Sequence, residues 1–406
     1  MNPSPRGRAT TCLLATCQTW VSTAALPPLL RAAGARVTGL SPWPLRLCSA
    51  VAENIAGPRD PREAAACLRR LLATRRFDHV IVADDALLRA LVEYGDRDAM
   101  RAWFPVDPTD DGALAFVLSK HAFTEGAARI GVPVPEFAFA RSVDEALDVA
   151  RSFGFPVVVK GPYGFGGLEV TVAHDARAVR AASLDVIEQY GRALVQHHVD
   201  GPNAGACVVY DHGVPLGFKA YLADCAYPTA NSASTVHELF EHPTLEPIVR
   251  AIGAATGFHG LLGIDFVIDQ AAGTPYAVEV NPRPTLGFAG AAANLRFFAP
   301  LIARFLDGSS ERLPTAVYAG PARLQAYFPG YLFYALRARR FGERAAYRRL
   351  LACLGEIRPG ELPLAAWQTL RILRDRFAGG ASPRDRSNAG FSLAGNPERR
   401  VVTDSR

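Results

Sequence analysis

Lysine is almost absent from this sequence of 406 residues: among its 44 basic residues, only Lys120, Lys160 and Lys219 are lysines. A GC-rich genome would by itself account for the arginines that supply the remaining positive charge. Lysine differs from arginine where a compact and mobile ammonium is needed. Three lysines within one stretch of 100 residues are therefore the first positions to examine for chemistry.

Paired cysteines are lacking as well. The seven cysteines are scattered, no two of them form a CxxC motif, and no Cys/His cluster has the spacing of a zinc site. Disulfide frameworks and structural zinc sites depend on such pairs. The cysteines therefore predict free thiols in a reducing cytosol, and we expect a cytoplasmic protein.

Long apolar runs are also absent, because none reaches the ~18 residues that a membrane-spanning helix needs. Arg6 and Arg8 before residues 11–17 faintly resemble the start of a secretory signal peptide. Gln18 and Trp20 interrupt the apolar run early, so a buried strand is the favoured interpretation. With 49% hydrophobic and 20% charged residues, the chain is typical of a globular protein of about two to four domains.

The N-terminal part of the chain alternates strands and helices. Strands are predicted over residues 11–17, 36–40 and 79–83, and helices over residues 24–35 and 84–94. This alternation is typical of βαβ units and a mostly parallel sheet. The first strand-to-helix turn lacks a GxGxxG motif, so we expect a nucleotide-binding fold that has lost its own nucleotide site. Residues 104–112 are rich in turn residues and predict a linker.

The pattern changes after residue 112. Helices are predicted over residues 113–130 and 143–153, with a break at residues 131–135, and a strand over residues 156–160. Strands and helices then continue to about residue 306. Residues 322–377 have a helical pattern, and about 25 C-terminal residues are predicted to be disordered.

Lys160 ends the predicted strand over residues 156–160 and is followed at once by a turn with Gly164, Gly166 and Gly167. Glycines let backbone N–H groups approach phosphate oxygens, and a neighbouring ammonium neutralises their charge. The spacing is not that of a Walker motif, because the lysine precedes the glycines. Two interpretations stay open for this segment alone: a phosphate-binding loop, or an ordinary strand-to-hairpin turn with a solvated lysine.

A second segment, residues 263–283, predicts a hairpin with its turn at residues 270–274. Such a turn pairs Asp265 with Glu279, and the period of two places Asn281 on the same face. Opposed carboxylates repel each other unless a cation lies near them. Asp, Glu and Asn oxygens suit Mg²⁺ or Mn²⁺, which also hold substrate phosphates. The alternative is a register slip of one residue, which would place one carboxylate in solvent; we favour the metal site.

In this order and separation, the two segments closely resemble the ATP-grasp superfamily, and the ending Asp265…Glu279-x-Asn281-Pro-Arg283 is its most specific mark. The resemblance covers about residues 1–310. It implies an α/β and α+β fold with a Rossmann-like pre-ATP-grasp domain, a two-lobed ATP-grasp fold and a helical C-terminal extension. The expected boundaries are 1–115 for the pre-ATP-grasp domain, 116–192 and 193–310 for the two lobes, 311–380 for the extension and 381–406 for a disordered tail.

The resemblance also implies catalytic roles. Lys120 resembles the first phosphate-binding lysine of the family, and Lys160 the second, which contacts the α- and β-phosphates. Lys219 lies where some relatives have a basic residue that reaches the γ-phosphate. Asp265, Glu279 and Asn281 resemble the ligands of two magnesium ions. Arg283 resembles the residue that stabilises the acyl phosphate or the intermediate of its attack.

The nucleotide site is implied in the same way. The loop over the phosphates would contain Gly164, Gly166 and Gly167, and the residues near adenine and ribose would be Gln196, His197, His198, Val199 and Asn203. The sequence departs from the family pattern at three positions: Asn203 where a ribose-binding Glu is usual, Glu169 where a third glycine is common, and Gly263 where some ligases carry a catalytic Arg. None of these removes a lysine or a metal ligand, so we expect an active site.

Three further features have competing interpretations. The adjacent residues His197 and His198 could be taken for metal ligands. Neighbouring residues on a strand point to opposite faces, however, so one packed and one exposed imidazole is favoured. His121 follows Lys120 and is near enough to approach phosphates, yet a solvated position on a helix is favoured. The polar loop over residues 229–235 is either part of the acceptor pocket or a plain surface loop.

The C-terminal segment is rich in arginine: residues 321–406 contain 16 arginines and 7 acidic residues. Arginines next to the aromatic residues 331–334 would suit peripheral contact with an anionic membrane or an acidic substrate. A cap on the preceding lobes, with its basic face in water, is favoured. The rest of the chain is not basic enough to predict nucleic-acid binding.

These expectations combine into an ATP-dependent carboxylate–amine ligase that uses ATP and Mg²⁺ (or Mn²⁺) and works through an acyl phosphate. The partners expected are a small-molecule carboxylate and amine, and a homodimer is left open. One alternative is an ATP-grasp kinase that transfers phosphate to a hydroxyl. Another is a non-catalytic ATP-binding scaffold, which the departures at Glu169 and Asn203 suggest.

Overall fold

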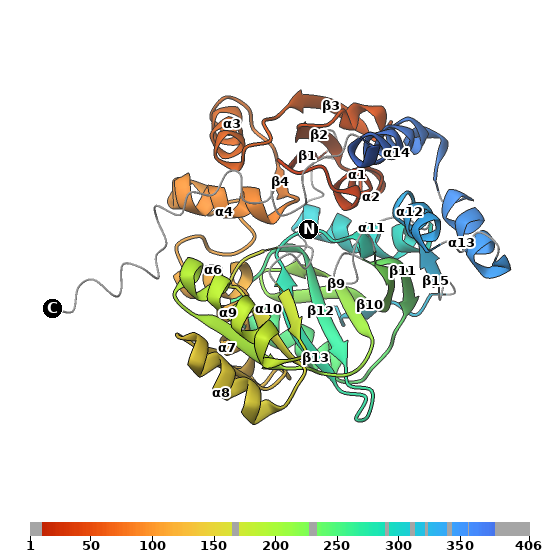
Figure 1. Ribbon diagram of the computed structural model, residues 1–406. Helices are drawn as coiled ribbons and strands as arrows, with labels where there is room; N and C mark the ends of the chain where they lie inside the picture. The colour runs from red at the N-terminus through yellow and green to blue at the C-terminus, as the bar shows by residue number, and fades with distance from the viewer. Residues whose placement is uncertain are drawn as a thin grey trace.

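The computed structural model describes residues 10–164, 170–226, 234–288, 292–308, 313–320, 324–338, 343–355 and 357–377. Three sheets organise these ranges, with the N-terminal sheet in the upper part of Figure 1 and the C-terminal helices at its right edge. Among the described helices, none has the length and apolar character required to cross a membrane. The domain boundaries expected from the sequence stay a proposal.

The N-terminal sheet is parallel, with strand order β3-β2-β1-β4. Its strands are β1 (Thr11–Ala15), β2 (Arg36–Ser41), β3 (Val51–Ala56) and β4 (His79–Val82). Its helices are α1 (Val21–Ala24), α2 (Leu26–Ala32), α3 (Pro61–Thr74), α4 (Asp85–Tyr94) and α5 (Arg97–Met100), with the 3₁₀ turn η1 (Leu45–Leu47). The predicted parallel sheet is confirmed. The predicted helix over residues 24–35 is two short helices, because Pro27 and Pro28 occupy the first turn of α2.

Asp84, at the carboxyl end of β4, fixes the geometry of this edge. It is fully buried, and its carboxylate accepts hydrogen bonds from Leu87 N, Cys17 N and Thr16 Oγ1, each at 2.8 Å. The first of these caps helix α4, and the other two hold the loop that follows β1. One side chain therefore joins the ends of two neighbouring strands.

We expect Asp84→Ala to destabilise the fold by about 3 kcal/mol, because it removes a helix cap and leaves two buried donors without acceptors. The control is Asp110→Ala, which removes an exposed cap on Ala113 N at 3.0 Å and should cost about 1 kcal/mol. Urea denaturation of both variants measures the difference. Equal losses would show that the buried network around Asp84 adds nothing beyond the cap.

The second sheet is small and antiparallel, with strand order β5-β8-β6-β7. Its strands are β5 (Phe137–Ala140), β6 (Val157–Lys160), β7 (Val170–Ala173) and β8 (Ala193–His197), and α8 (Val143–Phe153) and α9 (Ala176–Tyr190) pack on it around a core of their own. Two helices lead into it, α6 (Asp111–Leu118) and α7 (Lys120–Arg129). They replace the single predicted helix over residues 113–130, because Ser119 leaves the helical conformation and caps α7.

The third sheet is the largest, with strand order β13-β12-β9-β10-β11-β15 and with β14 beside β10. Its strands are β9 (Asn203–Asp211), β10 (Val214–Ala226), β11 (Ser234–Leu239), β12 (Gly260–Ile268), β13 (Pro275–Asn281), β14 (Ala316–Val317) and β15 (Leu324–Ala326). The accompanying helices are α10 (Leu245–Thr256), η2 (Leu286–Phe288) and α11 (Ala292–Asp307). Buried apolar clusters contain residues of both this sheet and the N-terminal sheet, so the two sheets share a hydrophobic core.

The C-terminal segment forms α12 (Gly330–Arg337), α13 (Arg344–Gly355), the turn η4 (Pro359–Glu361) and α14 (Leu362–Phe377). The helical prediction for residues 322–377 is wrong at its start, because β15 pairs with the edge of β11. Helix α14 lies beside α1 and α2 of the N-terminal part (Figure 1). The predicted disordered tail lies outside the described residues.

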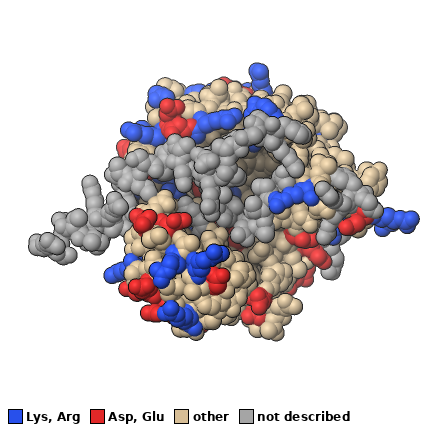
Figure 2. Space-filling model, viewed as in Figure 1, with Lys and Arg blue, Asp and Glu red and all other residues tan. Residues whose placement is uncertain are grey.

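The surface charges of the described residues are mixed on the face that Figure 2 draws. Arginines and acidic side chains alternate there over the N-terminal and central parts. On this face, the described surface therefore has no continuous basic patch.

Candidate active site

The hairpin of β12 and β13 brings the three predicted metal ligands together. Asp265 pairs with Glu279 in the antiparallel ladder, with a bulge directly after Asp265, and Gly263 pairs with Asn281. The Asn281 amide donates a hydrogen bond from Nδ2 to Asp265 Oδ2 at 3.0 Å. The register predicted from the sequence is confirmed, and the alternative of a slip by one residue is wrong.

The two carboxylates lie in different electrostatic surroundings. Burial raises the pKa of Asp265 to about 7, and the charge of Glu279 across the ladder adds to this rise. Burial acts against ionisation of Glu279 too, but the ammonium groups of Lys120 and Lys160 outweigh it and lower the pKa of Glu279. The pair therefore holds one firmly ionised carboxylate beside one that retains its proton up to about neutral pH. A divalent cation with oxygen ligands fits this donor set, because it would relieve the repulsion between the two groups.

Lys120 connects the hairpin to the glycine turn. Its side chain is at the start of α7, where Nζ is 2.9 Å from Glu279 Oε2 and donates to the carbonyl oxygen of Gly164 at 2.6 Å. Its backbone N–H also donates to Pro162 O at 2.7 Å. Gly164 has φ +122°, a backbone conformation that side-chain-bearing residues rarely adopt. Gly166, Gly167 and Glu169 lie outside the described residues.

Lys160 is buried at the end of β6, with 7% of its surface exposed. Burial lowers the pKa of its ammonium to about 8, and Lys120 contributes to this fall, while the charges of Glu279 and Asp265 oppose it. The alternative of a solvated lysine in an ordinary turn is therefore wrong. Both lysines face the same acidic pair from different elements.

His121 differs from the expectation of a solvated helix position. It is fully buried in α7, its Nε2 is 3.1 Å from the carbonyl oxygen of Lys160, and its ring packs edge-on against Phe139. Burial lowers its pKa to about 4. The prediction is wrong because β5 and β6 cover this face of the helix. His121 thus supports the backbone of Lys160 as a neutral imidazole.

The predicted hinge lies at β8, in the middle of the small sheet. Gln196 is buried there, and its Nε2 has no hydrogen-bond partner among the described residues. His197 is exposed, whereas His198 is half-buried with Nδ1 3.2 Å from Asp200 Oδ1, which agrees with the expected split of the two imidazoles. Asn203 is exposed at the start of β9.

Lys219 lies on the same face of the large sheet as the hairpin carboxylates. In the ladders, Lys219 pairs with Cys207, Cys207 pairs with Gly263, and Gly263 pairs with Asn281. The Lys219 side chain is 2% exposed and donates to Asn294 Oδ1 at 3.0 Å and Gln325 Oε1 at 2.5 Å. Burial lowers its pKa to about 8. Neutral amides therefore hold the Lys219 ammonium, and two strands, β9 and β12, separate β10 from the strand β13 that carries Glu279.

Arg283 reaches across from the hairpin to the N-terminal sheet. Its Nε donates to Asp85 Oδ2 at 2.6 Å, another guanidinium nitrogen donates to Asn281 Oδ1 at 3.0 Å, and its guanidinium lies 4.3 Å from the ring centre of Trp20. Asp85 is the first residue of α4, just after the carboxyl end of β4, and Trp20 lies in the loop after β1. Strand order reverses between these two strands, the place where open α/β sheets bind ligands.

Sequence reasoning missed the partners of these cations. The partners lie far from the motifs in the chain: they are Asp85, Trp20, Asn294 and Gln325. Only the positions of Asp85 and Trp20, after the carboxyl ends of predicted strands, could have marked them as site residues. The polar loop over residues 229–235 lies mostly outside the described residues, so its part in the site stays a prediction.

Residues 118–287 match the sequence profile of a family described as an ATP-grasp domain. This segment of the chain is similar to ATP-grasp domains. The matched range begins just before Lys120 and ends just after Arg283, so it contains both lysines and the whole acidic hairpin.

Carbamoyl phosphate synthase large chains are similar to this chain at low identity. The carbamoyl phosphate synthase large chain of Acidobacterium capsulatum is 26% identical over 230 residues, which cover 52% of this chain and 20% of that protein. The chain therefore spans about a fifth of the length of this relative.

Two solved structures share the fold. N5-carboxyaminoimidazole synthetase from Staphylococcus aureus matches with TM-score 0.58 and 14% identity, over 85% of this chain and 89% of that one. The biotin carboxylase domain of 2-oxoglutarate carboxylase from Hydrogenobacter thermophilus, solved with MgADP, ADP and bicarbonate, matches with TM-score 0.57 and 16% identity, over 76% and 72% of the two chains.

We expect Mg²⁺ to stabilise the protein more at pH 8 than at pH 6. If Asp265 is a metal ligand, as the sequence predicts, it must be ionised to bind Mg²⁺, and because its pKa is raised to about 7, protons compete with the ion below that pH. The apparent affinity should fall by about tenfold for each pH unit below 7. Thermal unfolding with and without MgCl₂ at both pH values measures the effect.

The control for this experiment is Asp265→Asn, in which the pH dependence should disappear together with most of the stabilisation. Equal stabilisation of the natural protein at pH 6 and pH 8 would contradict the assignment of Asp265 as a ligand. Stabilisation of the variant equal to that of the natural protein would contradict it as well.

Proposed function

We propose that this protein is an ATP-dependent carboxylate–amine ligase, which joins a small-molecule acid to an amine and releases ADP and phosphate. The observation that carries the proposal is the meeting of Lys120 and Lys160 with the Asp265–Glu279 pair, with Arg283 beside it. The match of residues 118–287 to an ATP-grasp domain supports the ATP site. The solved relative with MgADP and bicarbonate supports a nucleotide–magnesium complex next to a small oxyanion.

The lysines hold the phosphates of ATP in this proposal. Lys120 changes partner from Glu279 to a phosphate oxygen, while Lys160 gives a buried positive charge from the end of β6. Asp265, Glu279 and Asn281 would hold magnesium, which when bound would supply positive charge that favours transfer of the γ-phosphoryl group. Catalysis then consists mainly of positioning and charge stabilisation by the chain.

Arg283 serves the second half of the reaction. The substrate carboxylate attacks the γ-phosphorus and the bond to ADP breaks, which gives an acyl phosphate; an amine nitrogen then attacks the acyl carbon, and phosphate leaves. Negative charge grows on the acyl oxygen during this attack, and in the proposal the Arg283 guanidinium stabilises it; the hydrogen bond of Arg283 to Asn281 supports this role. Asp85 and Trp20 keep the guanidinium in place from the N-terminal side.

The nucleotide base binds at β8 in this proposal. The buried Gln196 with its unpartnered Nε2, together with the backbone of His197, His198 and Val199, is suited to the polar edge of adenine. Asn203 offers an amide to the ribose hydroxyls. Lys219 is the remaining cation on the same sheet face, and in the proposal it approaches the γ-phosphate after release from Asn294 and Gln325. A cytoplasmic location and a homodimer stay predictions.

The test is an ADP-release screen over pairs of carboxylates and amines, with mass detection of the products. A ligase releases phosphate and forms an amide whose mass equals the two substrates minus water. A kinase would instead leave the phosphoryl group on the acceptor. ATP binding without ADP release over the whole panel would overturn the enzymatic proposal.

A further inference from the structure

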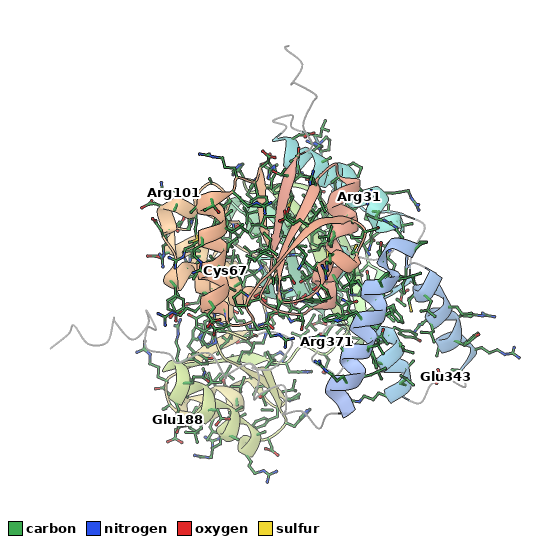
Figure 3. The ribbon with its side chains drawn as sticks, turned by 90° about the horizontal axis from the view of Figure 1, so that it is seen from above. Arg31, Cys67, Arg101, Glu188, Glu343 and Arg371 are labelled. Carbon is green, nitrogen blue, oxygen red and sulfur yellow. The ribbon has the colours of Figure 1, made fainter. Side chains whose placement is uncertain are left out.

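The C-terminal helices are fixed against the N-terminal part by three separate contacts. Ser49 N donates to the carbonyl oxygen of Gly360 at 2.9 Å, and the rings of Trp43 and Trp367 stack with centroids 5.8 Å apart. Arg371, labelled in Figure 3 on α14, donates to the carbonyl oxygen and the hydroxyl of Thr19. These contacts fix α14 and η4 against the loops that follow β1 and β2.

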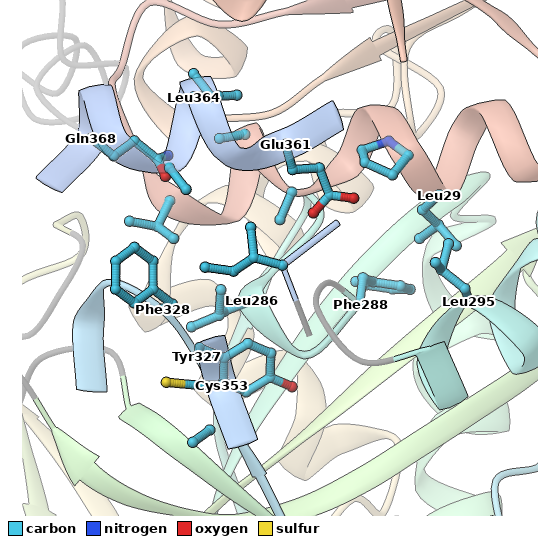
Figure 4. A pocket seen from close by; sticks show the side chains of 17 residues that line it. Leu29, Leu286, Phe288, Leu295, Tyr327, Phe328, Cys353, Glu361, Leu364 and Gln368 are labelled. Carbon is cyan, nitrogen blue, oxygen red and sulfur yellow. The ribbon is translucent and has the colours of Figure 1, made fainter. Parts of the chain in front are cut away.

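A cavity of about 80 Å³ lies between these helices and the large sheet (Figure 4). Its walls come from α1 and α2, from the segment after the acidic hairpin, from β15, and from α13 and α14. The apolar side chains that the argument uses are Leu29, Leu286, Phe288, Leu295, Phe328 and Leu364. An engineered cavity of about 150 Å³ holds benzene, so this one has room for a group of about three or four heavy atoms.

The walls also carry polar side chains: the Tyr327 hydroxyl already donates to Gln325 Oε1 at 3.0 Å, and the two that concern a ligand here are Gln368 and Glu361. Gln368 is 6% exposed, and its Nε2 has no hydrogen-bond partner in the described part of the chain. The Glu361 carboxylate points among the apolar lining side chains in Figure 4, and Arg358 is its nearby cation, with Nε 3.9 Å from Oε1. A buried amide donor without an acceptor is costly, and a ligand can satisfy it. The site thus offers one donor and one acceptor beside an apolar space.

The cavity lies next to the reaction centre along two chain segments. Trp20 stacks on Arg283, and the next residue, Val21, lines the cavity. Leu286 lines it three residues after Arg283. Two short chain segments therefore connect the cavity walls to Arg283 and its Trp20 partner.

We propose that this cavity is the specificity pocket for the amine substrate, which has a branched aliphatic side chain and an amide group. The side chain fills the apolar space, the amide carbonyl accepts from Gln368 Nε2, and the amide N–H donates to Glu361. The free amine is then directed toward Arg283. An amino-acid amide or the N-terminus of a peptide with a first residue such as leucine has this chemistry. The assignment rests on the proposed ligase function.

The test is calorimetric binding of L-leucinamide to the full chain without ATP. Glycinamide lacks the side chain and 3-methylbutylamine lacks the amide, so each should bind at least tenfold more weakly than L-leucinamide. Ala365→Phe fills the cavity and should weaken L-leucinamide binding at least tenfold. Gln368→Leu should remove the preference for L-leucinamide over 3-methylbutylamine. Leu370→Ala, at a 66% exposed position on the same helix, is the control and should bind as the natural protein does.

Failure to bind L-leucinamide, or equal binding of the three ligands, would overturn the pocket. L-Leucinamide affinity and selectivity unchanged in both cavity variants would overturn it too, since binding would then be elsewhere. A product-formation assay distinguishes failure of the pocket proposal from failure of the ligase proposal. Amide synthesis without preference among these amines would reject the pocket and retain the ligase, whereas selective binding without ATP turnover for any acid would reject the ligase and retain the pocket.

Discussion

Glu279→Gln should lower the rate of ADP release by about 1000-fold while the protein remains folded. Glutamine has nearly the same shape as glutamate, so the β12–β13 ladder persists. It removes the ionised carboxylate that faces Asp265 and lies 2.9 Å from Lys120. Without this charge, the donor set loses its strongest ligand for a hard cation.

The measurement is a coupled assay for ADP with saturating ATP and MgCl₂, with circular dichroism as the check on folding. Glu238→Gln is the matched control, because it is the same substitution on an exposed residue of β11 in the same sheet. It should leave ADP release unchanged. Turnover of Glu279→Gln at the natural rate would eliminate the metal assignment.

The acidic hairpin was predictable because its geometry is local. Asp269 accepts hydrogen bonds from the backbone N–H groups of Ala271 and Ala272, both at 2.8 Å, which closes the turn that sets the register. Once the turn is placed, the period of two decides which side chains share a face. The opposition of Asp265 and Glu279 therefore follows from about twenty consecutive residues.

The partners of the cations were not predictable, because they depend on how distant segments pack. Arg283 and Asp85 are separated by 198 residues in the chain, and Lys219 and Gln325 by 106. Neither Asp85 nor Gln325 belongs to a motif. Only the assembled fold brings each into hydrogen-bond distance.

Tertiary packing also overrode local preference at two other places. His121 lies on a face of α7 whose pattern does not distinguish solvent from core, and Phe139 on β5 decides that it is buried. Residues 324–326 follow a helical pattern, but the free edge of β11 offers backbone hydrogen bonds, and β15 forms there instead. A sequence pattern indicates only the local preference of a segment for helix or strand. Pairing with a sheet edge from a distant segment can outweigh that preference.

Lys160→Arg should lower ATP turnover by about 100-fold even though it keeps the positive charge. Lys160 is 7% exposed at the end of β6, and its backbone carbonyl oxygen lies 3.1 Å from His121 Nε2. A planar guanidinium is larger and cannot occupy the same buried position without displacing the phosphates, and misplacement of about 1 Å costs about 100-fold in rate.

The companion variant is Lys160→Met, which keeps the length of the side chain and removes its charge. Both variants should bind ATP more weakly than the natural protein, and Met should be the more damaged of the two if charge and shape both contribute. Isothermal calorimetry with ATP and the ADP assay separate binding from turnover. Full activity of Lys160→Arg would mean that any cation suffices at this position. The persistence of lysine at this position, in a chain that otherwise uses arginine almost everywhere, would then need no chemical explanation.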